Sequence, residues 1–118
     1  MRRYFAVYQA ADRAGMEALL APGFTFTSPF DDRIGRDAYF GHCFPHAGSF
    51  RFREPMQVFA DGDEAVVVYE TEGKPGGTFH NAELFRFEGD RIASIDVFFG
   101  FLPGAREYLA WMQARVVE

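Results

Sequence analysis

The chain has 118 residues, with 12 basic and 17 acidic side chains and a formal net charge of −5. This length supports one domain with one core, so we expect a single domain over residues 1–118. An acidic chain without a basic run argues against nucleic acid or an anionic membrane surface as a partner. Phenylalanine accounts for 15 residues, and so many rings favour either an aromatic core or an apolar cavity lined by rings.

The cysteine usage bears on the compartment and on metal chemistry. Cys43 is the single cysteine, so it cannot form a disulfide within the chain, and His42 beside it would point elsewhere on a helix. We therefore expect neither a metal site nor a cofactor. The absence of a signal-like N-terminus predicts a cytoplasmic protein. The apolar run at 64–69 is far too short to cross a membrane.

The N-terminal part of the chain is predicted to be mainly helical. Tyr4, Phe5 and Tyr8 recur at helical spacing, which predicts that the chain begins with a helix. Pro22 ends the next helical segment, and Pro29 ends an alternating stretch of phenylalanine and threonine that is typical of a strand. In chain order, we expect helices over residues 2–14 and 16–22, a strand over 24–28 and a third helix over 37–44.

From residue 50 onward the pattern changes to that of strands. Pro55 indicates a bulge or an edge within the first of them, and the Asp-Gly-Asp sequence at 61–63 is a hairpin turn signal. Helices followed by a run of long strands indicate an α+β fold, with helices packed on one face of an antiparallel sheet. In chain order, we expect strands over 50–59, 64–72, 78–88 and 91–101, turns at 61–63 and 89–90, a loop at 74–77 and a last helix over 103–116.

Two segments carry a resemblance to a known family. Residues 82–100, AELFRFEGDRIASIDVFFG, join an acid-x-Phe-Arg-Phe strand to a Gly-Asp turn and a strand ending in Phe-Phe-Gly; the end of the first helix, at 8–15, is followed by MEALLAPGFTFTSP. The layout resembles the nuclear transport factor 2-like superfamily over nearly the whole chain, and within it the ketosteroid isomerase and SnoaL-like polyketide cyclase group. These motifs identify the fold better than the reaction, because members include several kinds of enzyme and proteins with no chemistry.

The resemblance implies a cone-shaped fold, in which a curved, mixed and mostly antiparallel sheet wraps around the N-terminal helices and leaves an apolar pocket. If Glu83 faces that pocket, alternation along the strand places Asn81 and Phe85 beside it and Leu84 on the outer face. Members commonly dimerise through the outer face, so a homodimer is expected there, with Leu84, Ile92 and Phe98 on it. The side chains expected to contact a ligand are Phe26, Ser28, Tyr69, Asn81, Phe85, Val97 and Phe99.

The resemblance also implies two catalytic groups. Ketosteroid isomerases polarise a ketone with a tyrosine of the first helix and a carboxylic acid that stays protonated, and these positions correspond to Tyr8 and Glu83 here. SnoaL-type cyclases place their catalytic acid at the position of Glu83 as well. An apolar setting would disfavour the charged carboxylate and let Glu83 donate a proton near neutral pH. The alternative is a buried acid that is satisfied by Tyr8 or Tyr69 and has no chemical role.

The usual catalytic base of the resembled enzymes has no direct counterpart in this chain. In ketosteroid isomerases an aspartate precedes the proline at the end of the first strand, whereas this chain has Ser28, which cannot act as a base without a group to take its proton. Steroid isomerisation by that mechanism is therefore disfavoured. A turn could fold Asp31 or Asp32 back over the pocket to supply a carboxylate. The alternative is a turn whose acids face solvent, paired with Arg33 or Arg36.

Two functions remain open at this point. The first is a cofactor-independent isomerase, cyclase or dehydratase that acts on a small apolar carbonyl or hydroxyl compound, with Tyr8 and Glu83 as hydrogen-bond donor and acid and Asp31 or Asp32 as base. The second is a ligand-binding or dimerisation module that kept the pocket without the chemistry, for which Ser28 is the supporting observation.

Overall fold

The computed structural model describes residues 2–48, 50–53, 56–73 and 78–101, together with Ala110 and Ala114. The loop expected at 74–77 and, apart from those two alanines, the helix expected over 103–116 lie outside this part. The elements in chain order are α1 (Arg2–Gln9), α2 (Arg13–Leu19), β1 (Leu20–Ser28), β2 (Asp31–Gly35), α3 (Arg36–His42), the 3-10 helix η1 (Phe44–His46), β3 (Phe50–Phe52), β4 (Gln57–Asp61), β5 (Glu64–Gly73), β6 (Thr78–Glu88) and β7 (Arg91–Phe101).

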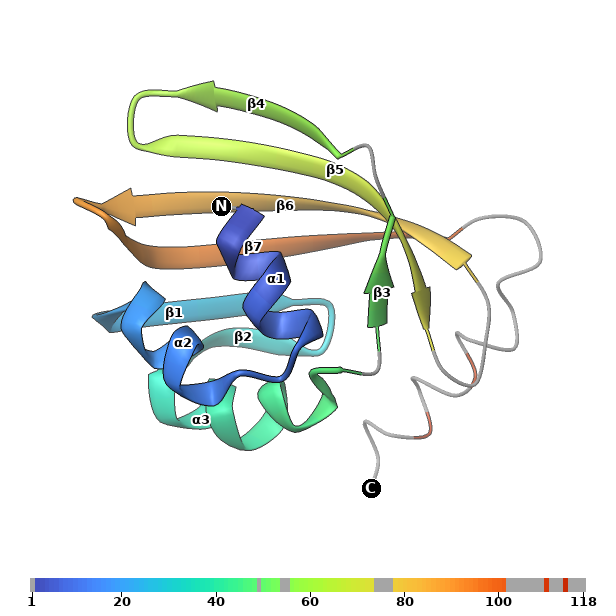
Figure 1. Ribbon diagram of the computed structural model, residues 1–118, viewed down its shortest axis with the longest axis horizontal. Coiled ribbons are helices and arrows are strands. Elements are labelled where there is room, and N and C mark those ends of the chain that lie inside the picture. The colour runs from blue at the N-terminus through green and yellow to red at the C-terminus, as the bar shows by residue number, and fades with distance from the viewer. Residues whose placement is uncertain are drawn as a thin grey trace.

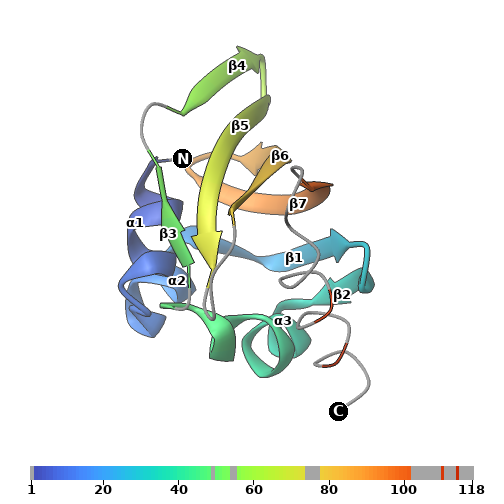
Figure 2. The same ribbon diagram turned by 90° about the vertical axis from the view of Figure 1, so that its right-hand side faces the viewer.

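The strands form one curved sheet with the order β2-β1-β7-β6-β5-β3, and β4 pairs with β5 beside β3. Every pairing is antiparallel except that of β1 with β7, which is parallel. The sheet curves over α1, α2 and α3, which lie on its concave side (Figure 1, Figure 2). The predicted α+β fold with a mixed, mostly antiparallel sheet wrapped around N-terminal helices is therefore confirmed.

The first helix ends earlier than predicted, and the second helix begins earlier than predicted. α1 ends at Gln9, and α2 already begins at Arg13, because the Asp12 carboxylate caps α2 by accepting a hydrogen bond of 3.0 Å from the backbone N–H of Gly15. A side chain at position 15 would collide with that carboxylate. Gly15 therefore lies inside a helix and permits its cap, instead of interrupting a helix as expected.

The strand predicted over 24–28 is longer at its start, and a further strand follows it. β1 begins at Leu20 and includes Pro22, where its pairing with β7 is irregular between Leu20 and Thr25. β2 was not predicted, because Ile34 is the one apolar side chain among its five residues and the alternating signal is absent. Pro29 and the next residue form the tight turn between β1 and β2.

The predicted strand over 50–59 is two strands. β3 pairs with the later part of β5, where Phe52 lies opposite Thr71, and β4 pairs with the earlier part, where Gln57 lies opposite Val68. Pro55, which suggested a bulge or an edge in this segment, lies outside the described residues. The turns at 61–63 and 89–90 and the strands β5, β6 and β7 follow the prediction closely.

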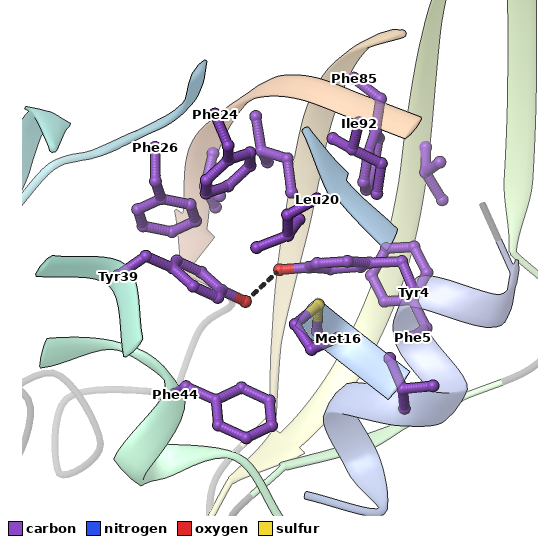
Figure 3. Packing of buried hydrophobic residues seen from close by; sticks show 14 of the residues in the cluster. Tyr4, Phe5, Met16, Leu20, Phe24, Phe26, Tyr39, Phe44, Phe85 and Ile92 are labelled. Carbon is purple, nitrogen blue, oxygen red and sulfur yellow. Dashed lines mark hydrogen bonds between the residues drawn. The ribbon is translucent and has the colours of Figure 1, made fainter. Parts of the chain in front are cut away.

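The core lies between the helices and the concave face of the sheet. Figure 3 shows rings and aliphatic side chains from α1, α2, α3, β1, β6 and β7 in contact, including Tyr4, Met16 and Phe24. Many of the rings pack edge to face, as for Phe24 and Tyr39, whose centroids are 5.2 Å apart. Much of the phenylalanine excess is thus used in an aromatic core, one of the two alternatives left by the composition.

One predicted core-versus-surface assignment is wrong. Ile92 was expected on the outer face, but it is 2% exposed and belongs to the core. The reason is a register shift between β6 and β7: Arg86 lies opposite Ser94 and Phe87 opposite Ile92, so β7 has one extra residue there. An extra residue reverses the facing of everything beyond it.

Candidate functional site

Glu83 is the buried acid of the sheet. It lies in the middle of β6, opposite Val67 of β5 and Val97 of β7, and it is 4% exposed. Burial raises the pKa of Glu83 from 4.5 to about 7, although a hydrogen bond from Tyr69 opposes the rise. A carboxyl group with such a pKa is present in both protonation states near neutral pH, so it can both donate and accept a proton.

A short hydrogen-bonded row runs from Glu83 along the concave face. The Tyr69 hydroxyl donates to Oε2 of Glu83, and Nδ2 of Asn81 donates to the Tyr69 oxygen at 3.2 Å. Asn81 is 7% exposed and Tyr69 is 4% exposed, so the row is shielded from bulk water. Oδ1 of Asn81 is buried and accepts no hydrogen bond from the described residues. Leaving such an acceptor unpaired costs about 1–3 kcal/mol.

Two tyrosines of the helices lie close to Glu83 in this row. Tyr4 of α1 and Tyr39 of α3 are buried, and their hydroxyl oxygens lie 3.0 Å apart (Figure 3). Burial raises the pKa of both and of Tyr69 well above 10, and the charge of Glu83 adds to the rise in each case. These tyrosines therefore stay protonated at neutral pH and present hydroxyl groups to one another and to Glu83.

Tyr8, the expected hydrogen-bond donor, lies at the junction of α1 and α3. Its ring stacks on that of Tyr4 at a centroid distance of 6.0 Å, and its hydroxyl donates to the backbone oxygen of Cys43 at 3.3 Å. It also raises the pKa of Tyr69 slightly by its proximity. The structure thus brings Tyr8 next to the tyrosines around Glu83, with its hydroxyl directed to α3.

Asp31 is folded back against the end of β1. The Ser28 hydroxyl donates to Oδ2 of Asp31 at 3.1 Å, and the Cys43 thiol lies 3.6 Å from the same oxygen as a second donor. The two-residue turn that places Asp31 opposite Ser28 is held by a 3.1 Å bond from the Phe30 backbone N–H to the Ser28 hydroxyl. The half-buried Asp31 carboxylate therefore stands beside the serine that replaces the expected aspartate.

Asp32, the other acid of the pair, does not join this arrangement. Its side chain is 83% exposed and forms an ion pair of 3.3 Å with the exposed Arg33. Of the two alternatives drawn from the sequence, the solvent-facing turn paired with Arg33 therefore describes Asp32. Asp31 instead folds back onto Ser28 and Cys43, and its position over a ligand pocket stays a prediction.

The remaining expected ligand contacts lie on the concave face. Phe26, Phe85 and Val97 are buried. Phe99 is half-buried, and its ring packs against that of Phe30, which is 37% exposed, at a centroid distance of 5.7 Å. The described residues also form a groove of about 260 Å³ elsewhere, against α1 and β3, which none of these side chains lines; its residues are Arg2, Phe5, Ala6, Gln9, Phe52 and Met56.

Three participants were not expected as site residues. They are Tyr4, Tyr39 and Cys43. Their positions in the sequence gave no sign that the two hydroxyls would meet across α1 and α3 or that the thiol would reach Asp31. Such contacts between distant elements carry no local sequence signal.

Within the described ranges, no group of three or more His, Cys, Asp or Glu side chains is placed to hold a metal ion. The same part of the chain contains no helix with the length and apolar character needed to span a membrane.

The comparisons with known proteins concern the family and the fold. The model of one family, described as the SnoaL-like domain, matches residues 1–95. No protein of curated function shows significant similarity to the chain.

Several solved structures have the same fold. An NTF2-like protein of unknown function from Cytophaga hutchinsonii has a TM-score of 0.73 and 19% identity, covering 92% of this chain and 89% of its own. An NTF2-like protein of unknown function from Burkholderia pseudomallei has a TM-score of 0.72 and 21% identity, covering 99% and 94%. A proposed polyketide cyclase from Silicibacter sp. has a TM-score of 0.71 and 16% identity, covering 95% and 89%. At these identities the likeness concerns the fold alone.

Proposed function

Because the chain belongs to the SnoaL-like domain family within the NTF2-like superfamily, we propose that it binds a small, largely apolar carbonyl or hydroxyl compound on the concave side of its sheet. We propose further that it acts on this compound as a cofactor-independent isomerase, cyclase or dehydratase. The observation that carries the proposal is the buried carboxyl of Glu83, whose pKa is raised to about 7. Perturbed acids of this kind concentrate at functional sites, and one structural neighbour is a proposed polyketide cyclase.

In this proposal Glu83 is the general acid. Tyr69 donates to Oε2, which leaves Oε1 to carry the proton and to donate it to the carbonyl oxygen of the substrate. That hydrogen bond draws electrons toward the oxygen and acidifies the neighbouring C–H group. The apolar surroundings strengthen the interaction, because little water competes for it.

Asp31 is the base in the same scheme. It takes the proton from the carbon next to the carbonyl, and the electron pair moves to form an enol whose oxygen is held by Glu83. In an isomerisation, Asp31 returns its proton to another carbon. In a cyclisation, the enol attacks a second carbonyl, whose oxygen takes the proton held by Asp31; in a dehydration, a hydroxyl on the next carbon takes that proton and leaves as water. In the last two cases the carbonyl re-forms and the proton on its oxygen returns to Glu83. Ser28 and Cys43 orient the carboxylate through their contacts with Oδ2. Tyr8 becomes a second donor if its hydroxyl exchanges the Cys43 carbonyl for the substrate.

The experiment is a thermal-shift screen of hydrophobic ketones and lactones, followed by turnover assays of the compounds that bind. Glu83→Gln keeps a hydrogen-bond donor, but an amide donates more weakly than a carboxylic acid and cannot transfer a proton. We therefore expect this variant to bind ligand more weakly and to lose turnover. Tyr8→Phe should weaken binding and lower the rate. If neither substitution alters binding or turnover of any ligand found, the proposed site is wrong.

A second candidate function is ligand binding without chemistry. Ser28 stands where the ketosteroid isomerases have their base, and the Asp31 carboxylate already accepts from two donors. Ligands that bind in a manner dependent on Glu83 but are never turned over would favour this alternative.

We also propose that two copies of the chain associate through the outer face of the sheet. Phe98 is 59% exposed and lies opposite Ala82 on this face, and Phe59 of β4, which is 64% exposed, lies opposite Val66. Large exposed rings close to half-buried aliphatic side chains are costly in water unless a partner covers them. Ile92, which was expected on this face, does not contribute because it is buried.

A further inference from the structure

The unpaired oxygen of Asn81 is the feature of the concave face that the proposed reaction leaves unused. Asn81 is 7% exposed, and its Oδ1 has no hydrogen-bond partner among the described residues. The orientation of the amide follows from its neighbours: the Tyr69 hydroxyl gives its hydrogen to Glu83, so its oxygen accepts from Nδ2 of Asn81. Oδ1 therefore points away from this row as a free acceptor.

The position of Asn81 relates this acceptor to the proposed acid. Asn81 and Glu83 are two residues apart on β6 and share its concave face, so their Cα atoms are about 6.5–7 Å apart. Asn81 lies opposite Phe99 of β7. The ring of Phe99 packs on the partly exposed Phe30 of the β1–β2 turn. Asn81 thus stands between the buried carboxyl and the end of the sheet where Phe30 reaches solvent.

We propose that Asn81 selects the ligand: the compound that binds carries a hydroxyl group whose hydrogen is accepted by Oδ1 of Asn81, while its carbonyl oxygen is bound by Glu83. This inference rests on the proposed function and narrows its substrate class from carbonyl or hydroxyl compounds to compounds with both groups, such as phenolic or alcoholic ketones. The carbonyl and hydroxyl oxygens of the ligand must therefore be far enough apart to reach both Glu83 and Asn81, whose Cα atoms are about 6.5–7 Å apart.

The chemistry of the row explains why a hydroxyl is favoured over other substituents. A ketone without a hydroxyl would leave Oδ1 buried and unpaired in the complex, and sites built to bond a hydroxyl discriminate strongly against analogues that lack one. A carboxylate on the ligand would be repelled by the Asn81 oxygen and by ionised Glu83. An uncharged O–H donor satisfies the amide oxygen without that repulsion.

Binding of 1-tetralone and its three isomeric 5-, 6- and 7-hydroxy derivatives, measured by isothermal titration calorimetry, tests the inference. These ketones share one bicyclic skeleton and differ in whether, and how far from the carbonyl, they carry a hydroxyl. For the wild type, we expect at least one isomer to bind about 2- to 12-fold more tightly than 1-tetralone. Asn81→Leu, which has a similar volume and no acceptor, should abolish that gain and bind 1-tetralone as well as or better than the wild type.

Glu83→Gln separates a failure of this inference from a failure of the proposed function. If 1-tetralone binds in a manner sensitive to Glu83→Gln but no isomer gains affinity through Asn81, the inference is wrong and the proposed function stands. If none of the tetralones binds the wild type, both are wrong.

A measurement without ligand provides the second test, because a water molecule held permanently by Oδ1 would give the amide a purely structural role. Asn81→Leu removes one hydrogen bond, to Tyr69, together with one unpaired acceptor. The two effects oppose each other, and we expect the Tm to change by less than about 4 °C. A much larger fall, with no effect on ligand selectivity, would assign Asn81 to the architecture of the protein and overturn the inference.

Discussion

The hydroxyl groups of Tyr4 and Tyr39 meet at 3.0 Å inside the core and join α1 to α3. Both side chains are at most 4% exposed, so each hydroxyl depends on the other. A buried polar group that loses its partner retains the full cost of its desolvation.

Tyr4→Phe and Tyr39→Phe should therefore each lower the free energy of unfolding by about 1–3 kcal/mol. The double variant should cost clearly less than the sum, because it leaves no orphaned hydroxyl. Urea unfolding of the four proteins gives the coupling energy. Additive effects would show that the two hydroxyls do not depend on each other.

The ionisation of Glu83 should make stability depend on pH. Its pKa rises from 4.5 to about 7 on folding, so the folded protein binds the proton more tightly than the unfolded chain. The stability that this carboxyl contributes is fully present below pH 4.5 and is lost as the pH rises through 7.

Relative to Glu83→Gln, the wild type should accordingly lose roughly 2–3 kcal/mol of unfolding free energy between pH 5 and pH 8. Urea unfolding at both pH values measures the difference, and subtracting the variant removes the effect of every other titrating group. A difference that does not change with pH would mean that this carboxyl is not desolvated.

The adjacent acids of the β1–β2 turn provide a matched pair of variants. Asp31 accepts from Ser28 and Cys43, whereas Asp32 is in solvent beside Arg33. With a turned-over ketone, Asp31→Asn should reduce kcat about 10²- to 10⁴-fold, the usual contribution of a general base. Asp32→Asn should leave kcat within a factor of two or so of the wild type, since exposed ion pairs contribute little. Equal losses in both variants would assign the effect to the turn as a whole.

The outer face of the sheet makes a prediction about association. Phe98→Glu places a charge in the centre of the proposed contact and should convert a dimer to a monomer in sedimentation equilibrium experiments. Ala10→Glu, at an exposed position after α1, should leave the association unchanged. A wild-type protein that stays monomeric at all accessible concentrations would rule the proposed dimer out.

The parts of this structure with strong local signals were predictable. The bounds of β6 and β7 follow from long runs of alternating side chains joined at Gly89, which has a positive φ of 65° that glycine adopts easily. The same alternation placed Glu83 and Asn81 on the concave face, where they are buried. Elements with weak signals were missed: β2 has Ile34 as its one apolar side chain, and a single extra residue moved Ile92 from the predicted surface to the core.

The site divides along the same line. Tyr69 was one of two expected partners for Glu83, because the sequence places Tyr69 and Glu83 on neighbouring strands of the sheet. The direction of Tyr8 and the partners of Asp31 depend on how α3 packs against the β1–β2 turn, which pattern alone does not encode. Alternation along one strand was enough to predict which way Glu83 faces. The contacts of Tyr8 and Asp31 could not be predicted, because they depend on how α1, α3 and the β1–β2 turn pack together.

The parallel pairing of β1 with β7 has a consequence for synthesis of the chain. Phe26 lies beside Ile95, so the first strand acquires its central neighbour only after almost the whole sheet has left the ribosome. Until then the edge of β1 that faces β7 has unpaired backbone groups, and closing so long a loop is slow compared with forming a hairpin. Nascent chains halted before residue 91 should therefore be bound by chaperones and cut readily by proteases, whereas chains that include β7 should resist both.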